Sequence, residues 1–245
     1  MFNIIRRNIP NTITLLNCLS GVLAIAFAFR FNETIAGIAG WKWSIVMIAA
    51  AAVFDFLDGA AARLLGAYSP LGKELDSLSD TVSFGVAPAM LLYNYLLVAN
   101  NNLLDANSSG IGLFVYAPFF LPLMAGLRLA KFNIDTTQAT EFRGLPVPAN
   151  AMFWVGMVWA LVADQLTIRL NVLVILIVAL GLLMVCRLRM FSLKFHNFAF
   201  RENLLRYTII LATIALVAWL GVAGLAAAIG LYVLLSALNS VISFE

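Results

Sequence analysis

The chain has 245 residues, of which 63% are hydrophobic and 11% charged, and its formal net charge is +3. A soluble domain is about 45–50% apolar and about 25% charged, so this composition excludes an ordinary soluble domain and predicts a polytopic membrane protein. The positive charge does not indicate nucleic-acid binding, because the basic residues are spread along the chain rather than gathered in one patch.

The first ten residues mix Phe2 and isoleucines with Arg6 and Arg7, and we expect this amphipathic segment, 1–10, to lie in the membrane interface. Apolar stretches follow that have about the 20 residues a spanning helix needs. They cover about residues 11–30, 42–64, 72–99, 111–132, 146–165, 168–187, 204–222 and 223–243. Gly85 and Pro88 predict a kink in the third stretch. We therefore expect an all-α fold: one integral membrane domain over residues 1–245, a transmembrane helix bundle of about eight spans.

The Lys and Arg residues indicate the orientation of this bundle, because cytoplasmic segments carry an excess of them. With a cytoplasmic N-terminus, twelve of the 15 Lys and Arg residues fall on the inside. We therefore expect both termini in the cytoplasm and the protein in the cell (inner) membrane. The three basic residues on the outside would be Arg30, Lys42 and Arg169.

Four aspartates interrupt the second and third stretches near their predicted cytoplasmic ends: Asp55, Asp58, Asp76 and Asp80. A carboxylate in a membrane segment costs about 2.5–3.5 kcal/mol, so four together cost on the order of 10 kcal/mol. A chain keeps such a cluster if a cation neutralises it, and all-oxygen ligands favour Mg²⁺ or Mn²⁺. The aspartates therefore predict a divalent-metal site, with two ions expected.

Helix geometry allows the four carboxylates to meet. At about 100° per residue, the first two aspartates share one helix face and the last two share a face of the next helix. Gly66 and Pro70 in the linker predict a tight turn, so two antiparallel helices can point both pairs into one cavity. Arg63 offers a fork for a phosphate, and small residues beside the acids leave room for a ligand. These small residues include Gly59, Ala62 and Gly72.

The residues by themselves leave other interpretations open. The last two aspartates could be solvated acids near a helix N-terminus, and the first two could pair with Arg63 and Lys73 in a structural network. A metal-ion or proton transporter also keeps acids inside the membrane, although here they lie near one membrane end. A non-catalytic scaffold would leave the carboxylates without a role.

The spacing is itself a pattern: D-x-x-D-G-x-x-A-R from Asp55 to Arg63, eight residues, then G-x-x-x-D-x-x-x-D from Gly72 to Asp80. It resembles the signature of the CDP-alcohol phosphotransferases at every fixed position. The resemblance implies a helical membrane enzyme, open to the cytoplasm, that transfers a substituted phosphate from a CDP-linked donor to an alcohol and releases CMP. It further implies that the four aspartates are metal ligands, that Asp80 is also the general base, and that Gly59, Ala62, Arg63 and Gly72 hold CDP.

Further stretches, 76–88, 128–133 and 142–150, resemble the phosphatidylserine synthase branch of this family. The opening 9–14 is similar to the family as well, which adds Asn11 and Thr14 to the expected CDP-binding residues. The resemblance covers about residues 9–150, the expected catalytic core, and 151–245 would supply additional spans. It implies transfer of a phosphatidyl group from CDP-diacylglycerol to L-serine, and a homodimer among membrane lipids.

The acceptor is less specifically indicated than the donor. The nearest alternative is another member of the family that uses glycerol phosphate or inositol phosphate, acceptors that need a stronger cationic pocket. For serine, Arg128 or Lys131 at the cytoplasmic end of the fourth stretch could hold the carboxylate, although both also fit the positive-inside pattern. Arg187 and Arg189 are weaker candidates of the same kind.

Overall fold

The computed structural model describes residues 2–103, 112–134, 142–190 and 203–242, and they are mainly helical, with two short two-stranded sheets. The chain divides into two compact units, Met1–Ala130 and Lys131–Glu245. Among the described residues, five helical stretches are long and apolar enough to cross a membrane: Asn8–Phe29, Gly40–Leu65, Pro70–Ala99, Phe114–Ile134 and Arg206–Asn239. The predicted all-helical integral membrane protein is therefore confirmed.

The first unit begins with α1 (Phe2–Phe29), which continues without a break through Pro10. The hydroxyl groups of Thr12, Thr14 and Ser20 each donate a hydrogen bond to the carbonyl four residues earlier. These bonds satisfy polar side chains inside an apolar helix. The segment that we expected to lie in the interface is thus helically continuous with the first spanning stretch.

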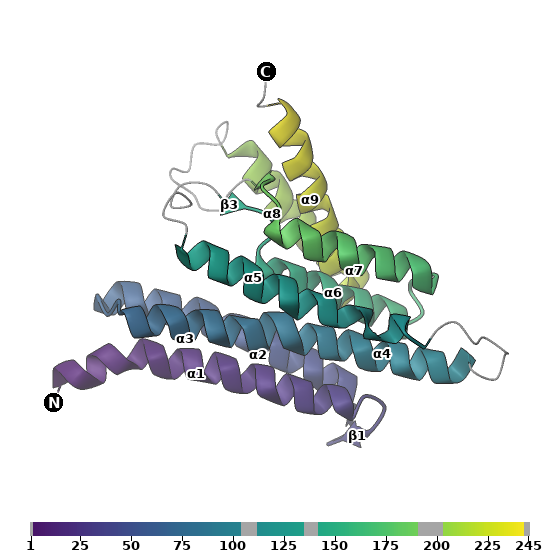
Figure 1. Cartoon of the computed structure of the whole chain (residues 1–245), viewed down its shortest axis with the longest axis horizontal. Helices are drawn as coiled ribbons and strands as arrows, with labels where there is room; N and C mark the ends of the chain where they lie inside the picture. Colours follow the sequence, from purple (N-terminus) through teal and green to yellow (C-terminus); the bar gives the residue numbers. More distant parts are fainter. Residues whose placement is uncertain (1, 104–111, 135–141, 191–202, 243–245) are drawn as a thin grey trace. The chain divides into compact units, whose positions relative to one another are not determined.

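A small antiparallel hairpin, β1 (Thr34–Ile35) and β2 (Ile38–Ala39), connects α1 to α2 (Gly40–Leu65). As a result α2 runs back along α1 (Figure 1). It ends at Gly66, which adopts the left-handed conformation with φ 59°, and the N–H of Ala67 then donates to the carbonyl of Ala62 at 3.0 Å. This return places the end of α2 near the start of α1.

The next helix, α3 (Pro70–Asp80), starts only four residues after Gly66. The hydroxyl of Ser69 accepts a hydrogen bond from the N–H of Gly72 at 3.0 Å and caps the helix. Pro70 occupies the first helical position, where its missing N–H has no cost. The tight turn predicted from Gly66 and Pro70 is therefore confirmed.

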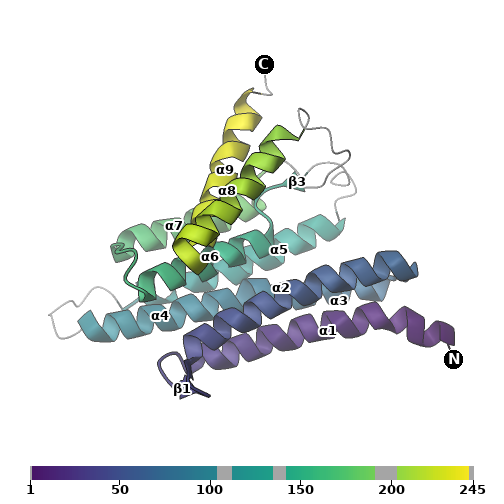
Figure 2. The ribbon, with the colours of Figure 1, turned by 180° about the vertical axis from the view of Figure 1, so that it is seen from behind.

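Beyond α3 the chain continues through the π-helical segment η1 (Thr81–Val86) into α4 (Ala87–Leu103), and the three form one long rod beside α1 and α2 (Figure 2). The N–H of Ala87 reaches back five residues to the carbonyl of Val82. Pro88 has no N–H to donate to the preceding turn, which favours such a change of hydrogen bonding. The sequence predicted a kink from Gly85 and Pro88, and the structure has a π-helical turn there, directly after Asp80.

The first unit is completed by the 3₁₀ helix η2 (Phe114–Phe119) and by α5 (Phe120–Ile134), which extends past the unit boundary. A Cβ atom at Gly85 would lie 3.1 Å from the Cβ of Ala125, so α5 packs closely on the π-helical turn. The interior of this unit is apolar, as burial of large side chains requires. Its fully buried side chains include Ile48, Phe84, Leu91, Leu92 and Leu121.

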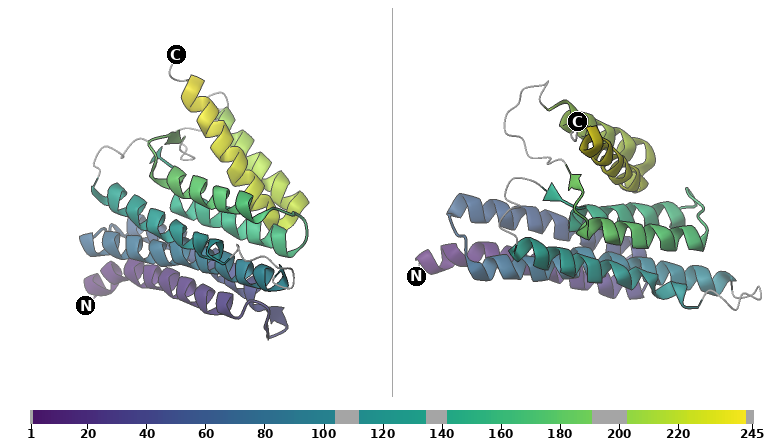
Figure 3. Two further views of the ribbon diagram at one scale, coloured as in Figure 1. Left: turned by 45° about the vertical axis from the view of Figure 1, so that its right-hand side comes forward. Right: turned by 45° about the horizontal axis from the view of Figure 1, so that its top comes forward.

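The second unit contains α6 (Val147–Val162), α7 (Leu170–Val185), α8 (Leu204–Leu220), the 3₁₀ turn η4 (Gly221–Ala223) and α9 (Gly224–Ile242). Helices α8 and α9 lie side by side (Figure 3). Two strands, β3 (Phe142–Arg143) and β4 (Arg189–Met190), pair antiparallel. Next to β3, Gly144 has φ 72°, and a Cβ atom there would lie 2.5 Å from the carbonyl oxygen of Met184.

Helices α6 and α7 are shorter than the stretches 146–165 and 168–187 that the sequence predicted. Helices α6 and α7 have 16 residues each, about 24 Å at about 1.5 Å per residue. The hydrocarbon core of a bilayer is about 30 Å thick. The fold thus supports a helical membrane bundle, while the number of spans, expected to be about eight, stays a prediction.

Candidate active site

Three of the four aspartates lie close enough to share an ion. Asp55 on α2 and Asp76 and Asp80 on α3 each offer a carboxylate oxygen, and these oxygens lie within 4.8 Å of one another. Such separations suit a divalent cation, because Mg²⁺ binds its oxygen ligands at about 2.1 Å and Ca²⁺ at about 2.3–2.6 Å. The turn between α2 and α3 therefore brings the two acidic helix faces together, as their spacing predicted.

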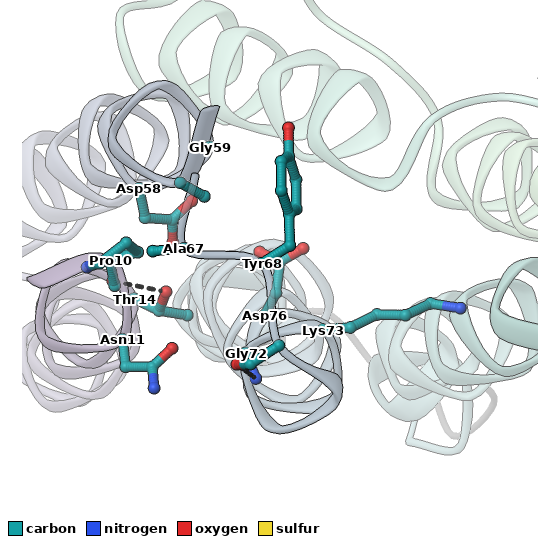
Figure 4. A pocket seen from close by; sticks show the side chains of 12 residues that line it. Pro10, Asn11, Thr14, Asp58, Gly59, Ala67, Tyr68, Gly72, Lys73 and Asp76 are labelled. Carbon is teal, nitrogen blue, oxygen red and sulfur yellow. Dashed lines mark hydrogen bonds between the residues drawn. The ribbon is translucent and has the colours of Figure 1, made fainter. Parts of the chain in front are cut away.

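The fourth aspartate, Asp58, lies beside a cavity of about 220 Å³ in the first unit. Helices α1, α2 and α3 all contribute to its wall, and the turn between α2 and α3 closes one side (Figure 4). Six residues singled out by the sequence pattern line it together with Asp58: Asn11, Thr14, Gly59, Ala62, Gly72 and Asp76. The cavity thus joins the acidic cluster to the residues expected to hold CDP.

Two carboxylate oxygens at this site are buried without a hydrogen-bond partner among the described residues. They are Oδ2 of Asp58, a residue that is only 6% exposed, and Oδ1 of Asp76. Leaving a buried polar group unsatisfied costs about 1–3 kcal/mol, and more when the group is charged. A cation held by these oxygens would remove that cost, so the residues present fit a divalent metal ion.

Gly59 leaves the wall of the cavity open. A Cβ atom built there would have the guanidinium of Arg63 as its nearest neighbour, at 3.7 Å. That distance is an ordinary van der Waals contact, so packing within the protein does not require glycine at this position. The missing side chain instead enlarges the space beside Asp58, where a ligand can approach the backbone.

The basic residues near the site are placed differently from the acids. Arg63 is exposed and does not line the cavity in the described part of the chain, although it lies next to Gly59. Lys73 lines the cavity, but its ammonium extends away from Asp58 and Asp76 (Figure 4).

The cations considered for the serine carboxylate lie on other elements. Arg128 is half-buried on α5, and Lys131, one turn later, is exposed. Arg187 is exposed beyond the end of α7. The backbone of Arg189 pairs with Arg143 in the β3–β4 ladder, while its side chain lies outside the described part.

One residue of the site was missed by the sequence analysis. Asn17 on α1 is fully buried, and its Nδ2 donates a hydrogen bond to Oδ1 of Asp80 at 3.2 Å. A signal was present, because Thr14, Asn17 and Gly21 follow one another at spacings of three and four on an otherwise apolar helix. These positions share a helix face, and that face meets the acidic helices.

The family model described as CDP-alcohol phosphatidyltransferase matches residues 7–241, nearly the whole chain. A Mycobacterium leprae protein named CDP-diacylglycerol–serine O-phosphatidyltransferase is 36% identical over 156 residues, which cover 61% of this chain and 46% of that protein.

Two further relatives carry the same name. One, from Methanocaldococcus jannaschii, is 36% identical over 177 residues, covering 72% of this chain and 70% of the relative. The other, from Bacillus subtilis, is 37% identical over 144 residues, covering 59% and 71% respectively. The chain therefore spans about half the length of the mycobacterial relative that it matches and about seven tenths of the other two.

Proposed function

We propose that this chain, which belongs to the CDP-alcohol phosphatidyltransferase family, transfers the phosphatidyl group of CDP-diacylglycerol to the hydroxyl of L-serine and releases CMP. The observation that carries the proposal is the acidic cluster beside a cavity whose wall contains Gly59, Ala62 and Gly72. The names of the three relatives support serine as the acceptor. Residues 9–150 would form the catalytic core of a single membrane domain, and the protein would act as a homodimer.

A divalent metal would be held by the four aspartates, and we propose two ions of Mg²⁺ or Mn²⁺. When bound, they would neutralise the carboxylates and the negative charge of the donor pyrophosphate. Asp55, Asp76 and Asp80 form one group of converging oxygens, whereas Asp58, whose Oδ2 is buried without a hydrogen-bond partner among the described residues, lines the neighbouring cavity. This separation of Asp58 from the other three aspartates supports the proposal of more than one ion.

The remaining residues have distinct roles in this proposal. Asn11 and Thr14, with the small residues of the cavity wall, would bind the CDP moiety, and Arg63 would neutralise phosphate charge. Asp80 would take the proton from the serine hydroxyl. The serine oxygen would then form a bond to the phosphatidyl phosphorus as the bond from phosphorus to CMP breaks. The acyl chains of the donor would remain in the lipid, because the site lies at the end of membrane helices.

Serine transfer is tested by following CMP release from CDP-diacylglycerol with purified protein. We expect release to depend on L-serine and to be very slow with ethanolamine, which lacks only the carboxylate. A site that pairs a buried charge rejects analogues without it, often by a factor of about 10⁴–10⁵. Arg128→Gln and Lys131→Gln, measured separately, identify the residue that holds the carboxylate, since its loss should raise the KM for serine more than that for the donor.

Two results would contradict this acceptor. Faster CMP release with glycerol 3-phosphate than with serine would assign the chain to another branch of the family. Absence of CMP release with every acceptor alcohol, despite donor binding, would refute the transferase itself.

We further propose eight spans with both termini in the cytoplasm, so that the cavity opens to the cytoplasmic side of the inner membrane. Aromatic side chains at the other end of α1 and α2 support a membrane–water interface there. Trp43 donates from Nε1 to the carbonyl of Ile35 at 2.9 Å and stacks on Phe27, while the ammonium of Lys42 lies 5.3 Å from the ring of Trp41. Trp and Lys are typical of a membrane–water interface.

Single cysteines test this topology in a background without Cys18 and Cys186. Thr34, in the β1–β2 hairpin, and Tyr68, in the turn between α2 and α3, are both exposed. We expect Thr34→Cys to react with an impermeant thiol reagent on intact cells, and Tyr68→Cys to react only after permeabilisation. The opposite pattern would invert the proposed orientation.

A further inference from the structure

Asn17 connects α1 to the acidic cluster through its side chain. Its Nδ2 donates to Oδ1 of Asp80 at 3.2 Å, and the two residues are 63 positions apart in the sequence. Asn17 is 0% exposed and Asp80 8% exposed, so water does not compete freely for this hydrogen bond. A hydrogen bond to a carboxylate in such surroundings is stronger than one between neutral groups.

The orientation of the Asn17 amide follows from chemistry. An ionised carboxylate only accepts hydrogen bonds, so the amide must turn an N–H toward Asp80. Its Oδ1 then points elsewhere, and it is buried without a hydrogen-bond partner among the described residues. An apolar side chain of similar size would avoid this unsatisfied oxygen. The amide therefore fits a role that depends on its bond to Asp80 rather than on filling space.

The hydrogen bond and the close approach that join α1 to η1 beside Asn17 do not involve its side chain. The hydroxyl of Ser83 donates to the backbone carbonyl of Asn17 at 2.9 Å, a bond that any residue at position 17 could accept. One turn later, Gly21 lets α1 approach the π-helical turn, since a Cβ atom there would lie 2.4 Å from Oγ of Ser83. Ser83 and Gly21 thus hold α1 against η1, and the hydrogen bond of the Asn17 amide goes to Asp80.

We propose that Asn17 is a positioning residue, which fixes the carboxylate of Asp80 so that it presents one oxygen to Asp55 and Asp76. The terminal torsion of an aspartate is broad and close to two-fold, and the bond from Asn17 restricts it before an ion arrives. Groups that orient a metal ligand in this way typically change metal affinity or activity by about 10–100-fold when they are removed. The inference deepens the proposed function, but its metal-binding part does not require serine to be the acceptor.

The test uses Asn17→Leu, which keeps the approximate size and removes the donor, and Asn17→Ala, which removes the donor without adding apolar bulk. Ser83→Ala is the matched control, because it removes the other hydrogen bond of this contact and keeps the amide. Mn²⁺ binding to the full-length protein in detergent is measured by electron paramagnetic resonance, together with the Tm without metal. Serine-dependent CMP release is measured at saturating Mn²⁺.

We expect both Asn17 variants to bind Mn²⁺ about 10–100-fold more weakly, and Ser83→Ala to keep the wild-type affinity even where its Tm falls. At saturating Mn²⁺, kcat should fall in the Asn17 variants while the KM for CDP-diacylglycerol changes little. Wild-type Mn²⁺ affinity in both Asn17 variants would overturn the proposal, as would failure of both to fold when Ser83→Ala folds. If the wild-type protein binds Mn²⁺ but does not use serine, the proposed function fails and the Mn²⁺ comparison still decides the role of Asn17.

Discussion

The Asp80→Asn variant is expected to bind CDP-diacylglycerol but to lose most of its turnover. General-base catalysis contributes typically about 10²–10⁴-fold, and an amide cannot take the proton from the serine hydroxyl. The substituted side chain still has an oxygen that can accept the hydrogen bond from Asn17, so the contact with α1 is kept. Turnover is measured as serine-dependent CMP release at saturating metal, donor and serine, and donor binding is measured directly.

The matched comparison is Asp58→Asn, because Asp58 lines the cavity and is not one of the three acids whose oxygens converge. We expect that variant to bind metal and nucleotide more weakly and to recover part of its turnover when both are raised. Asp80→Asn should not recover in this way, although some loss of metal affinity is expected there too. Turnover near the wild-type rate in Asp80→Asn would show that another group accepts the proton.

The turn that builds the site could be predicted because its signals are local. Gly66 adopts a left-handed φ that glycine tolerates, and Pro70 occupies the first position of α3. The spacing of the aspartates on each helix is also local, since helical periodicity alone decides which residues share a face. Together, the turn and the periodicity predicted that carboxylates of α2 and α3 would converge.

The features of the site that could not be predicted from the sequence depend on contacts between distant segments. The pairing of Asn17 with Asp80 needs the approach of α1 at Gly21, which no local propensity encodes. Arg63, placed among the CDP-binding residues by the sequence pattern, lies beside Gly59 rather than in the cavity wall of the described structure. The position of a long side chain such as that of Arg63 depends on its neighbours. Gly59 and Gly72, in contrast, line the cavity with their backbone atoms, which the helices hold in place.

Helix length was equally hard to predict in the second unit. Hydropathy alone extends the expected stretches over 146–165 and 168–187, but α6 ends at Val162 and α7 begins at Leu170. Asp164, between them, has φ 54°, a conformation that ends regular helical hydrogen bonding and that Asp adopts more readily than apolar residues do. Hydrophobicity thus located these segments, while backbone conformation set their ends.

Removal of divalent metal should abolish serine transfer and also destabilise the protein. Without a cation, the acids of the cluster repel one another at close range and leave buried carboxylate oxygens unpartnered. Treatment with EDTA should therefore stop CMP release, and Mg²⁺ or Mn²⁺ should restore it. An ion that binds the folded state adds about 2.7 kcal/mol of stability at a concentration of about 100 times its Kd, so Tm should rise with added metal.

Two variants show whether this rise in Tm belongs to the acidic cluster. Asp76→Asn removes one ligand and should lose most of the metal-dependent rise in Tm along with activity. Asp164→Asn is the matched control, because Asp164 is exposed, lies outside the cluster and has a backbone conformation that Asn also adopts readily. It should keep both the metal response and the activity. Full serine transfer after thorough chelation would refute the metal site, because four clustered aspartates, two of them buried, would then be tolerated, and catalysis would proceed, without a cation.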